Sequence, residues 1–157
     1  MNTEAIIDRF VVKQQASGIA IMAIGSAPWI DALVAQFPRG LPVSFEALVK
    51  RYSFPVLEIE DIELFSNLGD LSYDDISTAI FRDKAIYETT TKAGLIQFAR
   101  LRDGSYDPIC FDARTTKNNR EYPIVRLDHE ELLCNDRIKI KSKIADSFYK
   151  LLEDYLK

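Results

Sequence analysis

Apolar residues in the first third of the chain recur every three or four positions, which is the spacing of one face of an α-helix. This period predicts a first helix over residues 4–15 with Thr3 as its N-cap, a second that begins after Ser26, and a third that Leu41-Pro42 opens. Their apolar stripes are Ile6, Ile7, Phe10 and Val11; then Ile30, Leu33, Val34 and Phe37; then Phe45, Leu48, Val49 and Tyr52. The first third is therefore expected to be helical.

The period then shortens to two, which is typical of strands with one buried and one solvent-facing side. Residues 57–60 and 62–64 alternate apolar with acidic side chains, and residues 95–101, 106–112 and 122–127 are further predicted strands. Asp103-Gly104-Ser105 and Lys117-Asn118-Asn119 supply turns between the last three. Pro108 indicates an edge strand or a bulge, because proline cannot donate to a sheet's hydrogen-bond ladder.

Two more helices complete the expected pattern. Ser72 and Asp75 resemble a capping box that begins a helix with Ile76 and Ile80, and a closing helix buries Phe148, Leu151, Leu152 and Tyr155. Helices, an antiparallel sheet with one inserted helix and a last helix make an α+β fold, in which residues 95–128 form a three-stranded antiparallel meander. With no internal repeat or linker, residues 1–157 are expected to form a single domain.

Composition and charge narrow the class of protein. Hydrophobic residues make up 47% and charged residues 28%, as in ordinary globular proteins, and the net charge of −4 argues against general nucleic-acid binding. Two cysteines are too few for a disulfide framework and favour a reduced, cytoplasmic chain. The longest apolar run, residues 19–24, is too short for a membrane span or a secretory signal and predicts a buried connector or short strand.

Candidate catalytic chemistry centres on His129, the only histidine. Cys110 lies on a neighbouring predicted strand, so the two side chains could form a nucleophile–base pair. However, Cys110 stands between Ile109 and Phe111 as a core residue would, and Asp128-His129-Glu130 has the pattern of a strand end. The favoured interpretation is structural, and we do not expect an enzyme.

Metal and cofactor motifs have no match either. Cys110, Cys134 and His129 lack the spacing of a zinc site, and Asp103, Asp107 and Asp112 lack the glycine and closing glutamate of a calcium loop. The sequence contains neither of the glycine-rich motifs that hold nucleotide phosphates. We therefore expect no metal and no cofactor.

The charge distribution is uneven along the chain. Seven acidic residues and no basic residue lie between Glu58 and Asp75, whereas the bases between Arg137 and Lys143 are not interrupted by an acid. Such an acidic run is either a solvated face or a surface that attracts a basic protein partner, with a tyrosine near a turn as the anchor. The candidate partner-binding residues are Glu58, Glu60, Asp61, Glu63, Asp70, Tyr73, Asp74, Asp75 and Tyr106.

Several segments also follow one another in the order of a known family. They are Leu41-Pro42-Val43-Ser44-Phe45, Asp103-Gly104-Ser105-Tyr106 with Ile109-Cys110-Phe111-Asp112, Pro123-Ile124-Val125 with Asp128-His129-Glu130, and Ile144-Ala145-Asp146-Ser147-Phe148. This ordered set, over residues 30–156, resembles the SUKH superfamily of yeast cell-wall-assembly regulators and bacterial immunity proteins. The chain departs from that pattern where Tyr52-Ser53-Phe54-Pro55 replaces the Asn-Gly turn of many members.

The resemblance implies an α+β fold without catalysis, whose sheet and flanking loops bind another protein. For bacterial members it implies neutralisation of a toxin, often a nuclease. We therefore expect a cytoplasmic immunity protein that blocks a toxin domain with a basic surface. The alternative is a regulatory or scaffold adaptor that recruits its partner. Partner-binding residues vary between members of the family, so the resemblance assigns none here.

Overall fold

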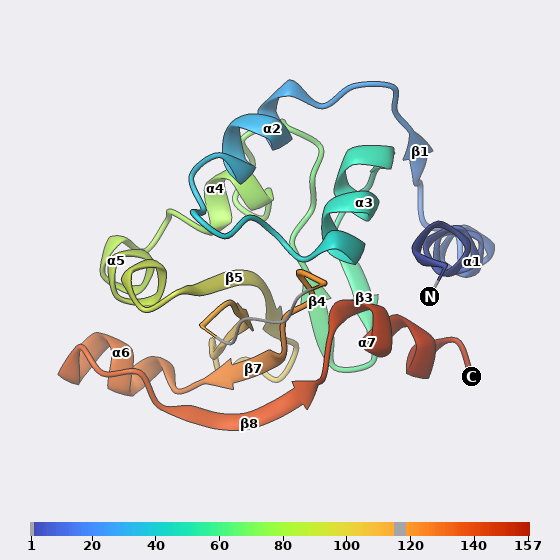
Figure 1. Cartoon of the computed structure of the whole chain (residues 1–157). Coiled ribbons are helices and arrows are strands. Elements are labelled where there is room, and N and C mark those ends of the chain that lie inside the picture. Colours follow the sequence, from blue (N-terminus) through green and yellow to red (C-terminus); the bar gives the residue numbers. More distant parts are fainter. Residues whose placement is uncertain (1, 115–118) are drawn as a thin grey trace.

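The computed structural model describes residues 2–114 and 119–157, in which helices frame one antiparallel sheet (Figure 1). The helices are α1 (Thr3–Ala16), α2 (Pro28–Val34), α3 (Val43–Arg51), α4 (Ile76–Ala79), α5 (Lys84–Lys92), α6 (His129–Asn135) and α7 (Phe148–Tyr155). The strands are β1 (Met22–Ala23), β2 (Tyr52–Ser53), β3 (Leu57–Ile59), β4 (Ile62–Leu64), β5 (Leu95–Leu101), β6 (Pro108–Asp112), β7 (Ile124–Leu127) and β8 (Ile140–Ala145). The fold class is α+β, as predicted.

The main sheet has six strands in the order β3-β4-β5-β6-β7-β8, and every neighbouring pair is antiparallel. The predicted meander over residues 95–128 is confirmed as β5, β6 and β7. A separate pair joins β1 to β2, and it includes the end of the apolar run of residues 19–24, where Met22 is exposed. The predicted turn at Lys117-Asn118-Asn119 falls largely outside the described residues.

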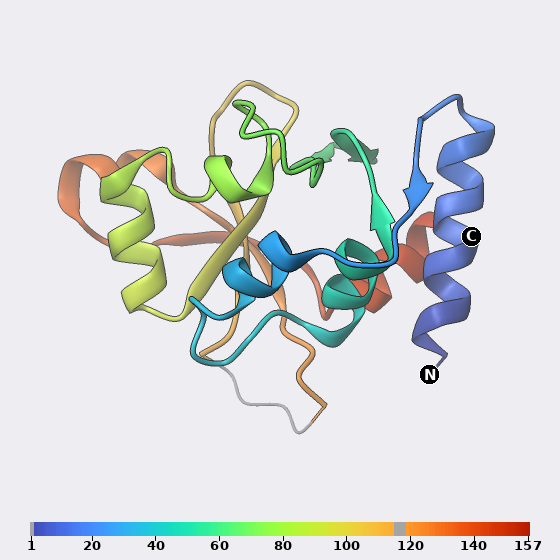
Figure 2. The ribbon, with the colours of Figure 1, turned by 90° about the horizontal axis from the view of Figure 1, so that it is seen from above.

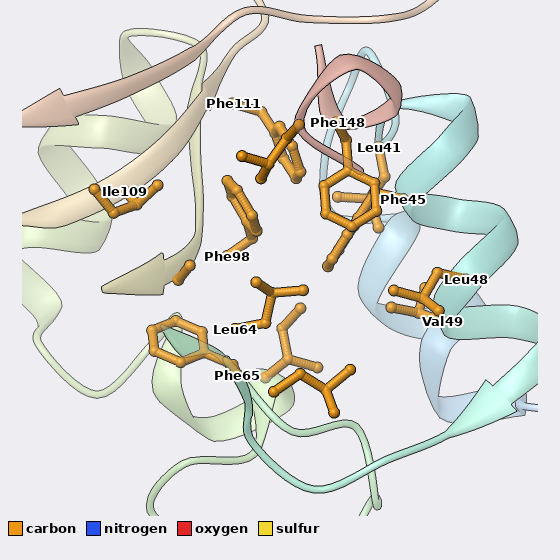
Figure 3. Packing of buried hydrophobic residues seen from close by; sticks show 14 of the residues in the cluster. Leu41, Phe45, Leu48, Val49, Leu64, Phe65, Phe98, Ile109, Phe111 and Phe148 are labelled. Carbon is orange, nitrogen blue, oxygen red and sulfur yellow. The ribbon is translucent and has the colours of Figure 1, made fainter. Parts of the chain in front are cut away.

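The core on one face of the sheet is built around four phenylalanines, shown in Figure 3. Phe45 of α3 and Phe148 of α7 meet edge to face with ring centroids 5.2 Å apart, and Phe98 stacks on Phe111 across β5 and β6 at 3.8 Å. All four rings are fully buried, so the predicted burial of Phe148 is confirmed. Aromatic contacts of this kind add to the free energy gained by burying apolar area. They lock both helices against the sheet.

The opposite face of the sheet is covered by α5 and α6, which lie at the other end of the molecule from α1 and α7 (Figure 2). A second apolar cluster fills this layer: Leu95, Cys110, Val125, Leu127 and Leu132. Because β5, β6 and β7 are covered on both faces, their sequences are nearly continuous apolar runs and lack the alternation seen in β3 and β4.

A buried carboxylate links the starts of two helices. Pro42 precedes α3 and has no side-chain donor or acceptor, so α3 lacks an N-cap side chain of its own. Glu121 takes that place by accepting hydrogen bonds from the Ser44 N–H at 2.7 Å and the Ser44 hydroxyl at 2.8 Å, and the backbone N–H of Tyr149 near the start of α7 also favours its charged form. Burial raises the pKa of Glu121 even though these donors act to lower it.

Several predicted boundaries were wrong. Asn2, not Thr3, caps α1, and Asp75, not Ser72, caps the helix that follows it. That helix ends at Ala79, and Asp83 caps a second helix, α5, where one helix was expected. A side-chain cap can start a new helix where the apolar spacing alone predicts a continuous one. Here the caps divide the predicted helix into α4 and α5.

Three further differences lie in the second half of the chain. Asp128 caps α6 rather than ending a strand, and residues 140–145 form β8, which was not predicted. Pro108 begins β6, which lies in the interior of the sheet, and the first residue of a strand tolerates proline. The facing strand β5 has a register shift between Gln97 and Ala99.

Over the described residues, the helices are all too short or too polar to span a bilayer.

Candidate interaction surface

The β3–β4 hairpin places its side chains as the alternation predicted. Leu57, Ile59, Ile62 and Leu64 are buried, whereas Glu58 lies exposed and Glu63 lies partly exposed as its cross-strand partner. Two carboxylates facing each other across a strand pair repel, so a nearby cation stabilises the arrangement.

That cation comes from β5, which pairs with β4. Arg100 is the cross-strand partner of Glu63 and forms ion pairs with Glu63 at 3.0 Å and with Asp74 at 2.8 Å, and Arg102 pairs with Glu58 at 3.1 Å. Partial burial acts to lower the pKa of Arg100, but the hydrogen bonds to Glu63 and Asp74 outweigh it and raise that pKa. The acidic run is thus partly neutralised by bases about forty residues away in sequence.

Asp75 belongs to the interior rather than to an exposed acidic surface. It is fully buried, and its carboxylate accepts the Gly69 N–H at 2.8 Å and, as the N-cap of α4, the Ser77 N–H at 3.1 Å. Its inclusion among the partner-binding residues was therefore wrong, because these bonds hold it inside the fold. The sequence pattern that placed it there, an acid following another acid, does not distinguish a cap from a surface charge.

The remaining acids are exposed. Glu60 and Asp61 form the β3–β4 turn, and Asp70 accepts the Ser72 N–H at 3.0 Å, a bond that lowers the pKa of Asp70. None of these three carboxylates forms an ion pair with a described residue. The Arg102 N–H donates to the Asp61 carbonyl at 2.9 Å, so the turn is fastened to the end of β5. Free negative charge on this part of the molecule comes mainly from these positions.

The two candidate anchor tyrosines line one cleft of about 260 Å³. Tyr73 and Tyr106 come from different loops, and their side chains are 62% and 73% exposed. The guanidinium of Arg82 lies 3.4 Å from the centre of the Tyr73 ring and donates to the Tyr73 carbonyl. The ring of His129 lies 6.3 Å from that of Tyr106. The cleft floor and walls include Phe65, Ile86, Gln97, Arg100 and Leu133.

Next to Tyr106 in the chain, the buried carboxylate of Asp107 binds one base from β7 and one from β8. Asp107 is 1% exposed and accepts hydrogen bonds from Arg126 at 2.7 Å, Lys141 at 3.0 Å and the His129 N–H at 3.1 Å. Burial acts to raise the pKa of Asp107, but these donors hold that pKa below its usual value. Lys141 is thus held by a buried carboxylate, whereas Arg137, Lys139 and Lys143 stay exposed and form ion pairs with Glu131, Asp128 and Asp146. The basic run is therefore largely a paired surface, with one contact to the interior.

The Cys110 thiol is unsuited to nucleophilic catalysis. It is fully buried in the cluster beneath α5 and α6, and burial, with a smaller effect from the charge of Asp112, raises its pKa far above the usual value. A nucleophilic thiol needs a lowered pKa. His129 instead lines the cleft and contacts Asp107. Among residues 2–114 and 119–157, no group of three or more His, Cys, Asp and Glu side chains is placed to hold a metal ion.

A second hollow, of about 290 Å³, lies beside the end of α5 and is lined by Arg39, Lys92 and Arg114. Two of these cations are already engaged. Arg39 donates to the Ala113 carbonyl, and Arg114 binds the Asp112 carboxylate with two contacts of 2.8 Å. This hollow therefore has less free charge for a ligand than its lining suggests.

Comparison with known proteins identifies no relative: no protein-family model matches this sequence, and no curated protein matches it. The candidate surface is therefore defined by the positions of its own side chains. It brings together Glu58, Glu63 and Asp74 through Arg100 and Arg102, and Tyr73 and Tyr106 through the cleft. Sequence analysis missed Arg82 and Arg100 because they lie outside the acidic run, although the position of Arg100 on a strand next to β4 was a usable signal.

Proposed function

We propose that this chain is a cytoplasmic immunity protein of the SUKH type that binds and blocks a toxin domain with a basic surface. The observation that carries the proposal is the placement of two exposed tyrosines, Tyr73 and Tyr106, on one cleft that Arg100 connects to the acidic β3–β4 hairpin. Tyrosine is enriched in protein-binding surfaces and at their hot spots, and charged residues lie mainly at the rim of such surfaces.

The proposed mechanism is steric and electrostatic. A toxin that cuts nucleic acid needs basic side chains to hold phosphates. The carboxylates of Glu60, Asp61 and Asp70 offer such a surface an alternative set of anions, and the tyrosines supply apolar contact once the two proteins meet. Occupation of the basic surface then excludes the nucleic acid. The order of elements and the α+β class also suit the SUKH resemblance, which itself remains a proposal.

The first experiment measures protection. A toxin domain encoded by a gene that neighbours this one, where the genome holds such a gene, is expressed in a bacterial host with and without the chain, and survival is counted. We expect the chain to restore growth and to form a complex with the toxin. Binding without protection would instead favour the adaptor alternative, and the absence of binding to such a toxin would contradict the immunity function.

The second experiment tests the acidic surface by association kinetics. Replacing Glu58, Glu60 and Glu63 together with lysine would also break the ion pairs with Arg100 and Arg102. The double variant Glu60→Lys/Asp61→Lys avoids this. We expect it to slow association by about tenfold at low salt, and much less at high salt, because steering acts over a Debye length of about 8–10 Å.

The control for this variant has the same change in net charge. Glu4→Lys/Asp136→Lys alters two exposed acids, one on α1 and one at the end of α6, and neither forms an ion pair with a described residue. It should leave the association rate nearly unchanged if the location of the charge matters. Equal association rates for the two double variants would show that the β3–β4 turn is only a solvated face.

A further inference from the structure

The loop of residues 66–75, between β4 and α4, carries three large apolar side chains into solvent. Leu68, Leu71 and Tyr73 are 47%, 75% and 62% exposed. Single exposed apolar residues are common on protein surfaces and need no explanation. Three within six residues of one loop form a patch, and such patches mark contact with another molecule.

Leu71 also has an unfavourable backbone conformation. Its φ is +58°, in the left-handed region that glycine and asparagine occupy readily and that a branched bulky residue rarely adopts. Folding does not account for a leucine here, because its side chain is almost entirely outside the core. Backbone strain at an exposed apolar residue is therefore best explained by a function of the side chain.

Hydrogen bonds at the base of the loop hold its backbone in one conformation. Its base is closed by hydrogen bonds from Ser66 N–H to the Asp74 carbonyl at 3.0 Å and from Ile76 N–H to the Ser66 carbonyl at 2.7 Å. Asn67 is buried, accepts the Phe54 N–H at 2.7 Å and donates to the Tyr52 carbonyl at 2.7 Å.

Gly69 and Asp75 fix the middle of the loop. Gly69 has a φ of +69°, and a Cβ at this position would lie 3.1 Å from the Trp29 ring, so the backbone rests directly on that ring. The Gly69 N–H donates to the buried Asp75 carboxylate. A loop ordered before binding loses little conformational entropy when a partner binds.

The geometry points to this loop as the apolar anchor of an interface whose partner is a basic amphipathic segment of another protein. The apolar side of that segment packs on Leu68, Leu71 and Tyr73, and Tyr73 continues the patch into the cleft. Its cations face the exposed carboxylate of Asp70, which lies between the two leucines in the loop. The inference deepens the proposed function by naming the contact, and it rests on that function only for the class of partner.

A phage-displayed library of random 16-residue peptides is the probe. Peptides selected on the immobilised full chain should be enriched in Lys or Arg together with Leu, Phe or Trp at helical spacing. Leu71→Gly should weaken their binding by about tenfold or more, while its melting temperature stays within about 2 °C of the wild type or rises, because glycine relieves the strain. A residue needed only for folding would lower the melting temperature.

Val12→Ala is the matched control, since Val12 is 63% exposed on α1. It should leave peptide binding unchanged. The proposal is overturned if no peptide is enriched, if Leu71→Gly binds the peptides as tightly as the wild type, or if vesicles of phosphatidylcholine with phosphatidylglycerol compete for the loop. If Leu71→Gly loses peptide binding but the wild-type chain neutralises no toxin, the immunity function is refuted and this inference still stands.

Discussion

Removal of the Phe148 ring tests how the closing helix is held on the sheet. The ring is fully buried, and its centroid lies 5.2, 6.1 and 6.2 Å from those of Phe45, Phe98 and Phe111. Phe148→Ala loses the transfer free energy of the ring and leaves a cavity bounded by three other rings, which cannot collapse without moving α3. The expected cost in the free energy of unfolding is about 4 kcal/mol, within the range of ~3–5 for buried phenylalanines.

The cost is large beside the total stability of a domain, which is about 5–15 kcal/mol. For a chain of this length it should lower the melting temperature by about 8–16 °C. Urea unfolding followed by circular dichroism measures it, with an unchanged m-value as the sign that the unfolding transition is otherwise the same.

A matched variant separates cavity formation from a general effect on α7. Phe148→Leu keeps most of the buried apolar volume and should cost about 1–2 kcal/mol, well below the alanine variant. If Phe148→Ala and Phe148→Leu cost the same, or if the alanine variant costs less than about 1 kcal/mol, the four rings do not form the packed cluster described above.

Two other predictions concern chemistry and pH. Cys110→Ser should preserve toxin binding and protection apart from any loss of stability, because the buried thiol is not proposed to react. Lost protection with unchanged melting and unchanged binding would reopen the enzyme hypothesis. Burial raises the pKa of Glu121 above its ordinary value of 4.5, so the folded state binds its proton more tightly than the unfolded state. Its contribution to stability is thus present below pH 4.5 and is lost as pH rises through the raised pKa. Compared with Glu121→Gln by urea unfolding from pH 4 to 8, the wild type should lose stability as pH rises; parallel curves would contradict this.

Patterns that depend on near neighbours in the chain were predictable from the sequence. The alternation over residues 57–64 correctly assigned the buried and exposed sides of β3 and β4, because side chains of a strand point to opposite faces whatever the strand pairs with. The closing helix and the burial of Phe148 followed in the same way from the helical period. The α+β class followed from the order of these local patterns.

Positions that depend on distant contacts were not predictable. The strand β8 is exposed over most of its length, and although residues 138–144 alternate isoleucine or serine with lysine, only the structure shows that β7 offers this segment an edge to pair with. The acid run looked uncompensated because Arg100 and Arg102 reach Glu63 and Glu58 only after β4 and β5 have paired.

The candidate site shows the same division. The sequence singled out Tyr73 and Tyr106, but only the tertiary structure placed them on one cleft. Asp75 and Asp70 are both acids in one loop, yet one is a buried cap and the other is exposed, because the loop closes on itself around Asp75.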